Sequence, residues 1–387
     1  MKATKYLGSL YFAAYAAIGA VLPFLSIYYH GLGLNGSQIS ALIALHPLAD
    51  LFLAPLWGGG ADRTGRHRNF LLLALTGASV AAFGFSFGRT FPALFLAAAS
   101  FAGFSTAIIP LLDTIAVQIL NDKVRNYGQI RLWGSAGSAS FVIAVGFLND
   151  RLGFHLMFAA YICLALLGIA IAFHLPHRST TLQHTSLQLH QVLGATLAIR
   201  KFRSLLVGLT FAGIAAGAGE AFLGILIADV GGTSLHVGLA FALQAIVEIP
   251  AMGLTRQVLQ RVTPRALFTW SFVGLTGILA MQSWIPLLSV ILLAQPLWGA
   301  AWVGYWTGSR IEIAEIVPSQ IQASAQTLAA SVSLGFGSLL GAVLSAILLE
   351  PLGVVTLYRV FTGLSVLGIL VFLIYEWRLA TRPSVRG

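Results

Sequence analysis

The chain alternates long apolar runs with short polar segments along its whole length. A helix needs about 20 apolar residues to cross the hydrocarbon core of a bilayer. By that measure the sequence predicts twelve membrane spans, at residues 6–29, 37–58, 70–88, 91–119, 129–149, 154–175, 203–228, 237–260, 265–284, 286–308, 320–349 and 352–376. The predicted fold class is therefore all-α and integral to the membrane.

The longest polar stretch runs from His177 to Lys201 and is rich in Thr, Gln and His. It predicts an amino-terminal six-helix bundle over 1–176, a cytoplasmic linker over 177–201 and a carboxyl-terminal six-helix bundle over 202–387. The halves also repeat, because residues 146–153 align with 345–353 and residues 34–40 align with 232–238. Repeats of equal span number and the same orientation predict pseudo-symmetric bundles related by an axis along the membrane normal, with the substrate site between them.

Composition and charge agree with this interpretation. Hydrophobic residues make up 58% of the chain and charged residues 9%, against about 25% charged in a soluble protein. The net charge of +10 would suggest a nucleic-acid partner in a soluble protein. Here it follows from the positive-inside rule: with both termini cytoplasmic, 17 Lys and Arg residues fall inside and three fall outside. We expect a multi-pass protein of the bacterial inner (cytoplasmic) membrane, with no nucleic-acid partner.

The loop after the second predicted span reads GGGADRTGRHR over residues 58–68. Glycine tolerates a turn with positive φ, and the aspartate can cap the next helix or pair with an arginine. The arginines are expected to face the cytoplasmic lipid surface. The spacing G-x-x-x-D-R-x-G-R-x-R after a membrane span resembles the signature loop of the major facilitator superfamily. The resemblance implies a transporter fold and a conformational gate formed by Gly58, Asp62, Arg63, Gly65, Arg66 and Arg68.

An acid and a base adjoin the turn between the fourth and fifth predicted spans. Asp113 lies inside one span and Arg131 inside the next, so in antiparallel helices they come close in depth. A charge at mid-membrane costs about 2.5–3.5 kcal/mol on insertion scales and requires a partner or a wet cavity. The two residues form a candidate substrate site, with a purely structural ion pair as the alternative.

The sequence around Asp113 and Arg131 resembles one branch of this superfamily more specifically. The segments PLLD over 110–113 and YGQIRLWGS over 127–135, with EIP at 248–250 and QASAQ at 322–326, resemble the branch of 3-phenylpropionate permeases. Lactose and nucleoside proton symporters are more distantly similar. The resemblance implies that Asp113 and Arg131 hold the substrate.

Three further carboxylates lie inside predicted spans: Asp50, Glu220 and Glu248. Asp50 shares a helix face with His46, four residues earlier, and is either a contact between the halves or a proton site. Glu248 has no local cation, and Glu220 lies among small residues that let another helix approach closely. An intramembrane carboxylate of this kind suits proton uptake and release. All three are proton-coupling candidates; the alternative is hydrogen bonding between helices as neutral acids.

Aromatic residues gather in the first, fifth and tenth predicted spans. Interfacial belts use the same residues, but the cluster over 298–306 is denser than a belt requires. We expect four of them to line the substrate site: Tyr15, Trp133, Trp302 and Tyr305.

The predicted function is proton-coupled symport of a small organic solute by alternating access. An arginine suits a carboxylate or a hydroxyl-rich solute, so an aromatic acid, a nucleoside and a sugar all stay open. The alternatives are a proton-driven exporter of drugs or sugars and a non-transporting sensor with this fold. No enzyme motif appears, and the single cysteine, Cys163, excludes a thiol metal cluster. We expect no cofactor, no metal and a monomer whose partners are solute, protons and lipid.

Overall fold

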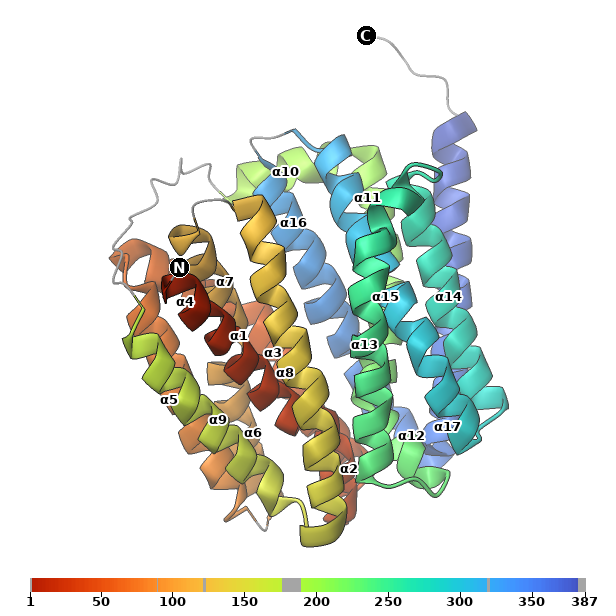
Figure 1. Ribbon diagram of the computed structural model, residues 1–387. Helices are drawn as coiled ribbons and strands as arrows, with labels where there is room; N and C mark the ends of the chain where they lie inside the picture. Colours follow the sequence, from red (N-terminus) through yellow and green to blue (C-terminus); the bar gives the residue numbers. More distant parts are fainter. Residues whose placement is uncertain (1, 89, 121–122, 176–188, 319–320, 382–387) are drawn as a thin grey trace.

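The computed structural model describes residues 2–88, 90–120, 123–175, 189–318 and 321–381. Every regular element in these ranges is a helix, which confirms the predicted fold class (Figure 1). The first half contains α1 Lys2–Val21, η1 Leu22–Phe24, α2 Leu25–Gly31, α3 Gly36–Phe52, α4 Ala54–Thr64, α5 His67–Phe85, α6 Phe91–Ser105, α7 Ile108–Ile119, α8 Lys123–Leu152 and α9 His155–Phe173.

The remaining helices gather on the other side of the molecule in Figure 1. They are α10 Leu189–Ala198, α11 Arg200–Ala221, α12 Leu223–Asp229, α13 Ser234–Leu259, α14 Pro264–Trp284, α15 Leu288–Ile316, α16 Gln322–Ala330, the π-helical η3 Ser331–Gly337 and α17 Ser338–Thr381. Part of the predicted linker is thus the short helix α10, which lies at the end where α1 begins; residues 177–188 fall outside the described residues.

Eleven helical segments of the described chain are long and apolar enough to cross a membrane. The last runs from Ser324 to Leu379 and has 56 residues, which is about 84 Å of helix against a hydrocarbon core of about 30 Å. It bends at Gly353, whose φ of 73° lies in the left-handed region that glycine adopts without strain. This segment covers the last two predicted spans, so the eleven segments account for all twelve.

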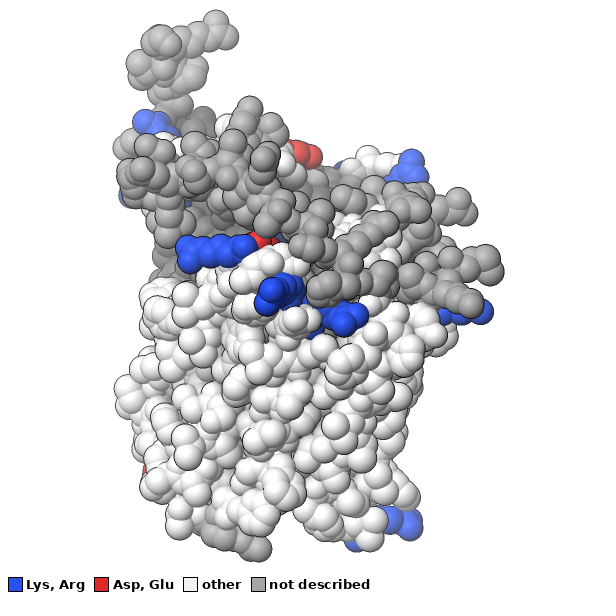
Figure 2. Space-filling model, turned by 90° about the vertical axis from the view of Figure 1, so that its left-hand side faces the viewer, with Lys and Arg blue, Asp and Glu red and all other residues white. Residues whose placement is uncertain are grey.

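On the outer face shown in Figure 2, the described charged residues gather toward the two ends of the molecule. On the face shown in Figure 2, Lys and Arg cluster near the end that carries the termini, with a smaller group at the opposite end. The wide belt between them is almost entirely uncharged on this face. A belt of this kind is what the hydrocarbon core of a bilayer requires.

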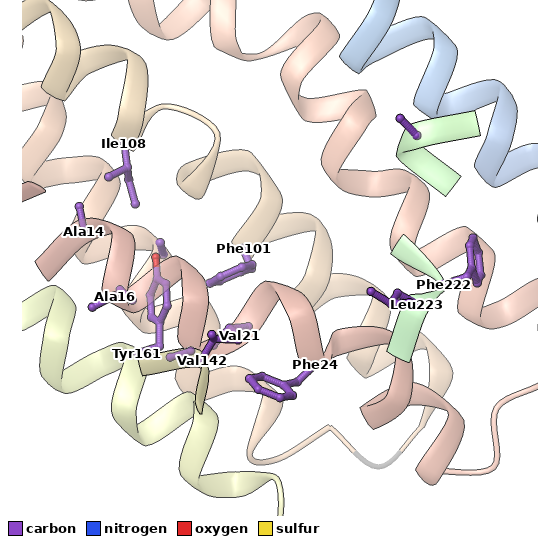
Figure 3. Close-up of a cluster of buried hydrophobic side chains, with 14 of the residues drawn as sticks. Ala14, Ala16, Val21, Phe24, Phe101, Ile108, Val142, Tyr161, Phe222 and Leu223 are labelled. Carbon is purple, nitrogen blue, oxygen red and sulfur yellow. The ribbon is translucent and has the colours of Figure 1, made fainter. Parts of the chain in front are cut away.

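Small and aromatic residues pack the interior. Figure 3 shows Ala14 and Ala16 of α1 beside Phe101 of α6 and Tyr161 of α9, with Phe24 of η1 below them. In a lipid environment apolar burial alone does not drive helix association, so close van der Waals packing of small residues must contribute. The alanines of α1 therefore allow α8 and α9 to approach closely.

The two halves are joined at the end away from the termini. Asp150, near the end of α8, accepts hydrogen bonds from the backbone N–H groups of Ser234 (2.8 Å) and Leu235 (2.9 Å) at the start of α13. At the equivalent contact, the hydroxyl of Ser37 at the start of α3 donates to the carbonyl of Ala346 in α17 (2.8 Å). These two contacts involve the segments that repeat along the sequence.

Candidate transport site

A cavity of about 420 Å³ lies between the halves. Helices α3, α6 and α8 contribute to its wall from the first half, and α11, α15 and η3 from the second. Its polar lining consists of two carboxylates, a histidine and four serines: Asp50, Glu220, His46, Ser26, Ser138, Ser333 and Ser338. Its aromatic lining consists of Tyr29, Phe85, Phe101, Phe222, Phe241 and Trp302.

Asp50 is partnered within its own half of the molecule. His46 Nδ1 lies 3.4 Å from its carboxylate, as the spacing of four residues predicted, and the hydroxyl of Thr106, just after α6, donates to it. Asp50 nevertheless lines the cavity that both halves share. Its position is compatible with a proton site, while its contacts with His46 and Thr106 stay within the first half.

Glu220 lies near the end of α11, on the opposite wall of the cavity. The indole N–H of Trp298 donates to its carboxylate at 3.0 Å. The adjacent Gly219 allows Trp298 to pack against the backbone, since an added Cβ would lie 3.1 Å from the indole ring. A carboxylate that meets a single neutral donor in this way is able to hold a proton inside the membrane.

Asp113 and Arg131 lie beyond the cavity lining, and two stacked tyrosines connect them. Tyr11 donates to the carboxylate of Asp113 at 2.5 Å, and its ring stacks on Tyr15 with 6.2 Å between centroids. The guanidinium of Arg131 lies 4.0 Å from the centre of the Tyr15 ring. Among the described residues, Asp113 and Arg131 do not form the direct ion pair that the sequence suggested.

Glu248 of α13 is the residue of the second half that lies near this group of first-half residues. Its carboxylate lies within electrostatic range of both Arg131 and Glu220. Arg131 lies seven residues before the cavity-lining Ser138, and Glu248 lies seven residues after the cavity-lining Phe241, or about two helical turns in each case. Because α8 and α13 run in opposite directions, both charges lie between the cavity and the end of the molecule that carries the termini. We call this the terminal side of the cavity, and that end of the molecule the terminal end.

The predicted aromatic residues separate into three environments. Trp302 lines the cavity and stacks on Tyr305 with 5.3 Å between ring centroids. Tyr305 itself is fully buried behind the wall, where its hydroxyl contacts Ser333. Trp133 is 56% exposed and lies on the outer face of α8 with Leu132, so the structure does not bring it to the cavity.

Most of the predicted signature loop over residues 58–68 is helical, because residues 58–64 belong to α4 and α5 begins at His67. Gly65 ends α4 with a φ of 64°, and Asp62 lies 2.8 Å from Nε2 of the buried His67. Arg68 donates to the carbonyl of Leu175 at 2.9 Å, which ties the loop to the end of α9. Three other predicted gate residues make no contact of this kind in the described chain: Gly58 faces open space, and Arg63 and Arg66 are exposed.

The structure adds residues that the sequence analysis did not select as site residues. They are Tyr11, an aromatic residue of the first predicted span, and Ser138 and Ser338, which carried no signal of their own. The half-chain repeat is the one signal that relates the two serines. The described residues contain no group of three or more His, Cys, Asp or Glu side chains able to hold a metal ion.

Known transporters are similar to this chain in sequence and in fold. The model of the MFS_1 like family matches residues 5–360. The maltose permease of Geobacillus stearothermophilus is 30% identical over 386 residues, which cover 97% of this chain and 94% of that protein. The transporter YwbF of Bacillus subtilis (strain 168) is 26% identical over 94% of this chain and 90% of its own length. The crystal structure of the nucleoside transporter NupG superposes with a TM-score of 0.84 at 20% identity, covering 97% of this chain and 99% of NupG.

Proposed function

Because the chain belongs to the MFS_1 like family of major facilitator transporters, we propose that this secondary transporter carries a neutral hydroxylated solute by proton-coupled symport. The observation that carries the proposal is the lining of the cavity. Two carboxylates, a histidine, four serines and six aromatic residues surround it, and none of the described lining residues is Lys or Arg. The protein is a multi-pass membrane transporter and not an enzyme, as its relatives are transporters.

The charge of the lining favours a sugar or a nucleoside over an aromatic acid. A solute carboxylate next to Asp50 and Glu220 would be repelled, and like charges repel strongly where little water screens them. Hydroxyl groups, in contrast, both donate to carboxylates and exchange hydrogen bonds with serines. A volume of about 420 Å³ lies within the range of about 300–1,000 Å³ typical of small-molecule sites.

Similarity to the maltose permease supports a sugar as the first solute to test. The resemblance to 3-phenylpropionate permeases favoured an aromatic acid through Arg131. In this chain, however, Arg131 is covered by Tyr15 and lies within electrostatic range of Glu248. Asp113 and Arg131 then hold the hydroxyl groups of a neutral solute that extends from the cavity toward the terminal end.

Proton coupling follows from the charges around Arg131. When Glu248 is ionised, Arg131 attracts it and the two halves are held together on the terminal side of the cavity. A proton on Glu248 removes that attraction, so protonation changes the relative stability of the two arrangements of the halves. Glu220 is the second proton acceptor, and Asp50 with His46 is the third candidate.

The orientation in the membrane is part of the same proposal. The excess of Lys and Arg at the terminal end supports cytoplasmic termini under the positive-inside rule, and the relatives are bacterial proteins. The end joined by Asp150 and α13 is then the outer end. Solute uptake requires these contacts to open and re-form as the halves rock.

The test is uptake into proteoliposomes with an imposed inward proton gradient. The probes are maltose, uridine and 3-phenylpropionate, and the variants are Glu248→Gln and Arg131→Ala. The matched control is Glu315→Gln, because Glu315 is exposed at the end of α15. We expect maltose or uridine to accumulate, to leak out with an uncoupler, and to fail to accumulate in both site variants but not in the control.

Other outcomes would replace the proposal. Accumulation of 3-phenylpropionate alone would favour the aromatic-acid interpretation. Emptying of preloaded vesicles under the opposite gradient, with no inward accumulation, would favour export. Binding of a solute with no movement in either direction would favour a sensor.

A further inference from the structure

Two serines of the cavity wall occupy equivalent positions in the two halves. Ser138 lies in α8 and Ser338 lies at the start of α17, and both line the cavity. They are 200 residues apart (338 − 138), which matches the offset between the repeated segments that end α8 and bend α17. The pseudo-symmetry of the fold therefore places one hydroxyl from each half in the same cavity.

Each serine packs against a glycine of the neighbouring helix, and these glycines are also equivalent. A Cβ added at Gly19 of α1 would lie 2.9 Å from the hydroxyl oxygen of Ser138. A Cβ added at Gly217 of α11 would overlap the side chain of Ser338. Gly19 and Gly217 line the cavity too and are 198 residues apart (217 − 19). The same arrangement of serine on glycine thus occurs twice.

Neither hydroxyl forms the local hydrogen bond that helical serines commonly form. Ser140 donates to the carbonyl of Ala136 at 2.7 Å, and Ser345 donates to the carbonyl of Gly341 at 2.8 Å. Within the described part of the chain, Ser138 and Ser338 have no such bond, and both are half-buried at the cavity. Since both hydroxyls line the cavity, their capacity to donate and accept hydrogen bonds is directed to the contents of the cavity.

We propose that Ser138 and Ser338 bind two hydroxyl groups of one solute, one from each half of the transporter. The inference rests on the proposed function and adds to it the residues that select a polyhydroxylated solute. Each serine can donate to one solute oxygen and accept from another group. A solute bound by both serines connects the halves directly and favours the arrangement in which they are close.

The experiment measures solute binding by purified, detergent-solubilised transporter, using isothermal titration calorimetry. The variants are Ser138→Ala, Ser338→Ala and the double variant, and the probes are maltose, uridine and a set of singly deoxygenated maltoses. The controls are Ser140→Ala in α8 and Ser345→Ala in α17, because both serines are bonded within their own helices. One neutral hydrogen bond contributes about 0.5–1.5 kcal/mol, so each site variant should weaken maltose binding about two- to tenfold.

The deoxygenated probes separate direct contact from a structural effect. We expect one deoxymaltose to bind wild type weakly but to lose no further affinity in Ser138→Ala. A different deoxymaltose should behave in this way with Ser338→Ala, since each missing hydroxyl is the partner of one serine. The double variant should lose the product of the two single effects, and the controls should stay within twofold of wild type.

The proposal fails if wild type binds maltose and both site variants bind it equally well. It also fails if the controls lose as much affinity as the site variants, or if no deoxymaltose shows the paired behaviour. If wild type binds neither maltose nor uridine, the proposed solute class is wrong. The proposal for Ser138 and Ser338 is then wrong as well, because it depends on that class. The first three results leave the proposed function intact, whereas the last one rejects both.

Discussion

At the residue scale, the main feature is that an acid and a base share a site without neutralising each other. Tyr11 holds Asp113 through its hydroxyl, and Tyr15 holds Arg131 through its ring. A cation over an aromatic face gains about 0.5–2 kcal/mol, while its N–H groups stay available at the ring edge. Both charges are therefore positioned by neutral groups and can still bind a solute.

Replacing Tyr11 by Phe tests this arrangement. The variant keeps the ring stack but removes the donor to Asp113, and a hydrogen bond to a charged group contributes about 1.5–3 kcal/mol. We expect the Kd for the transported solute to rise at least tenfold, measured by calorimetry. Tyr6→Phe is the control, because Tyr6 is exposed and stacks on His174. An unchanged Kd in Tyr11→Phe would show that Asp113 does not contact the solute.

At the element scale, the joint between α8 and α13 holds the two halves together at the end away from the termini. The carboxylate of Asp150 accepts two N–H groups at the start of α13, where the helix dipole favours a negative charge. Close approach supports the joint, because a Cβ added at Gly146 would lie 2.6 Å from the carbonyl oxygen of Ser234. In the proposed transport cycle, this joint must separate when the end away from the termini opens.

Removing the Asp150 carboxylate should favour opening of that end. Loss of a helix cap costs about 1 kcal/mol, which shifts a two-state equilibrium about fivefold. We expect Asp150→Ala to speed maleimide labelling of a cysteine placed at Ser26 by about that factor, in a Cys163→Ser background. Arg151→Ala is the control, since Arg151 lies over Phe147. Equal labelling rates in both variants would mean that the joint does not control access.

Gly353 allows the last two spans to turn within one continuous segment. Because its φ is 73°, a side chain there costs about 1–2 kcal/mol. Gly363, by contrast, has open space around its Cα and no positive φ, so alanine should stabilise the helix there by about 0.5–1 kcal/mol. We expect Gly353→Ala to lower the Tm of the purified protein by ~1–2 °C and Gly363→Ala to raise it slightly. The reverse order would contradict the left-handed turn.

At the scale of the whole molecule, the proposed proton coupling depends on carboxylates that lie at the boundary of the halves. Glu248 comes from the second half and Arg131 from the first, and they are within electrostatic range. A charge at such a boundary contributes differently to the two arrangements of the halves, which is the condition for a proton to drive transport.

The pH profile of Glu248→Gln tests the coupling. Wild-type uptake should rise as the external pH falls, because protons bind on the outer side and are released inside. In Glu248→Gln the side chain is neutral in both arrangements, so uptake driven by the proton gradient should be lost. Exchange of labelled for unlabelled solute across the vesicle membrane should persist. Retained gradient-driven uptake in this variant would move the coupling role to Glu220 or Asp50.

The sequence by itself determined the number and the positions of the apolar helical spans. Each span is a contiguous apolar run whose length is set by the thickness of the bilayer, so local composition is enough to locate it. The repeat over residues 146–153 and 345–353, and the turn at Gly65, are local patterns as well. All twelve predicted spans and the all-α fold are found in the structure.

The tertiary structure decided which side of each helix faces the cavity. In a bilayer the lipid-facing side and the buried side are both apolar, so the pattern of apolar positions does not reveal how a helix is rotated about its axis. For this reason Trp133, two residues from Arg131, lies on the outer face, and Tyr305 lies behind the cavity wall. Packing between helices also separated Asp113 from Arg131 and brought Ser138 and Ser338, distant in sequence, into one cavity.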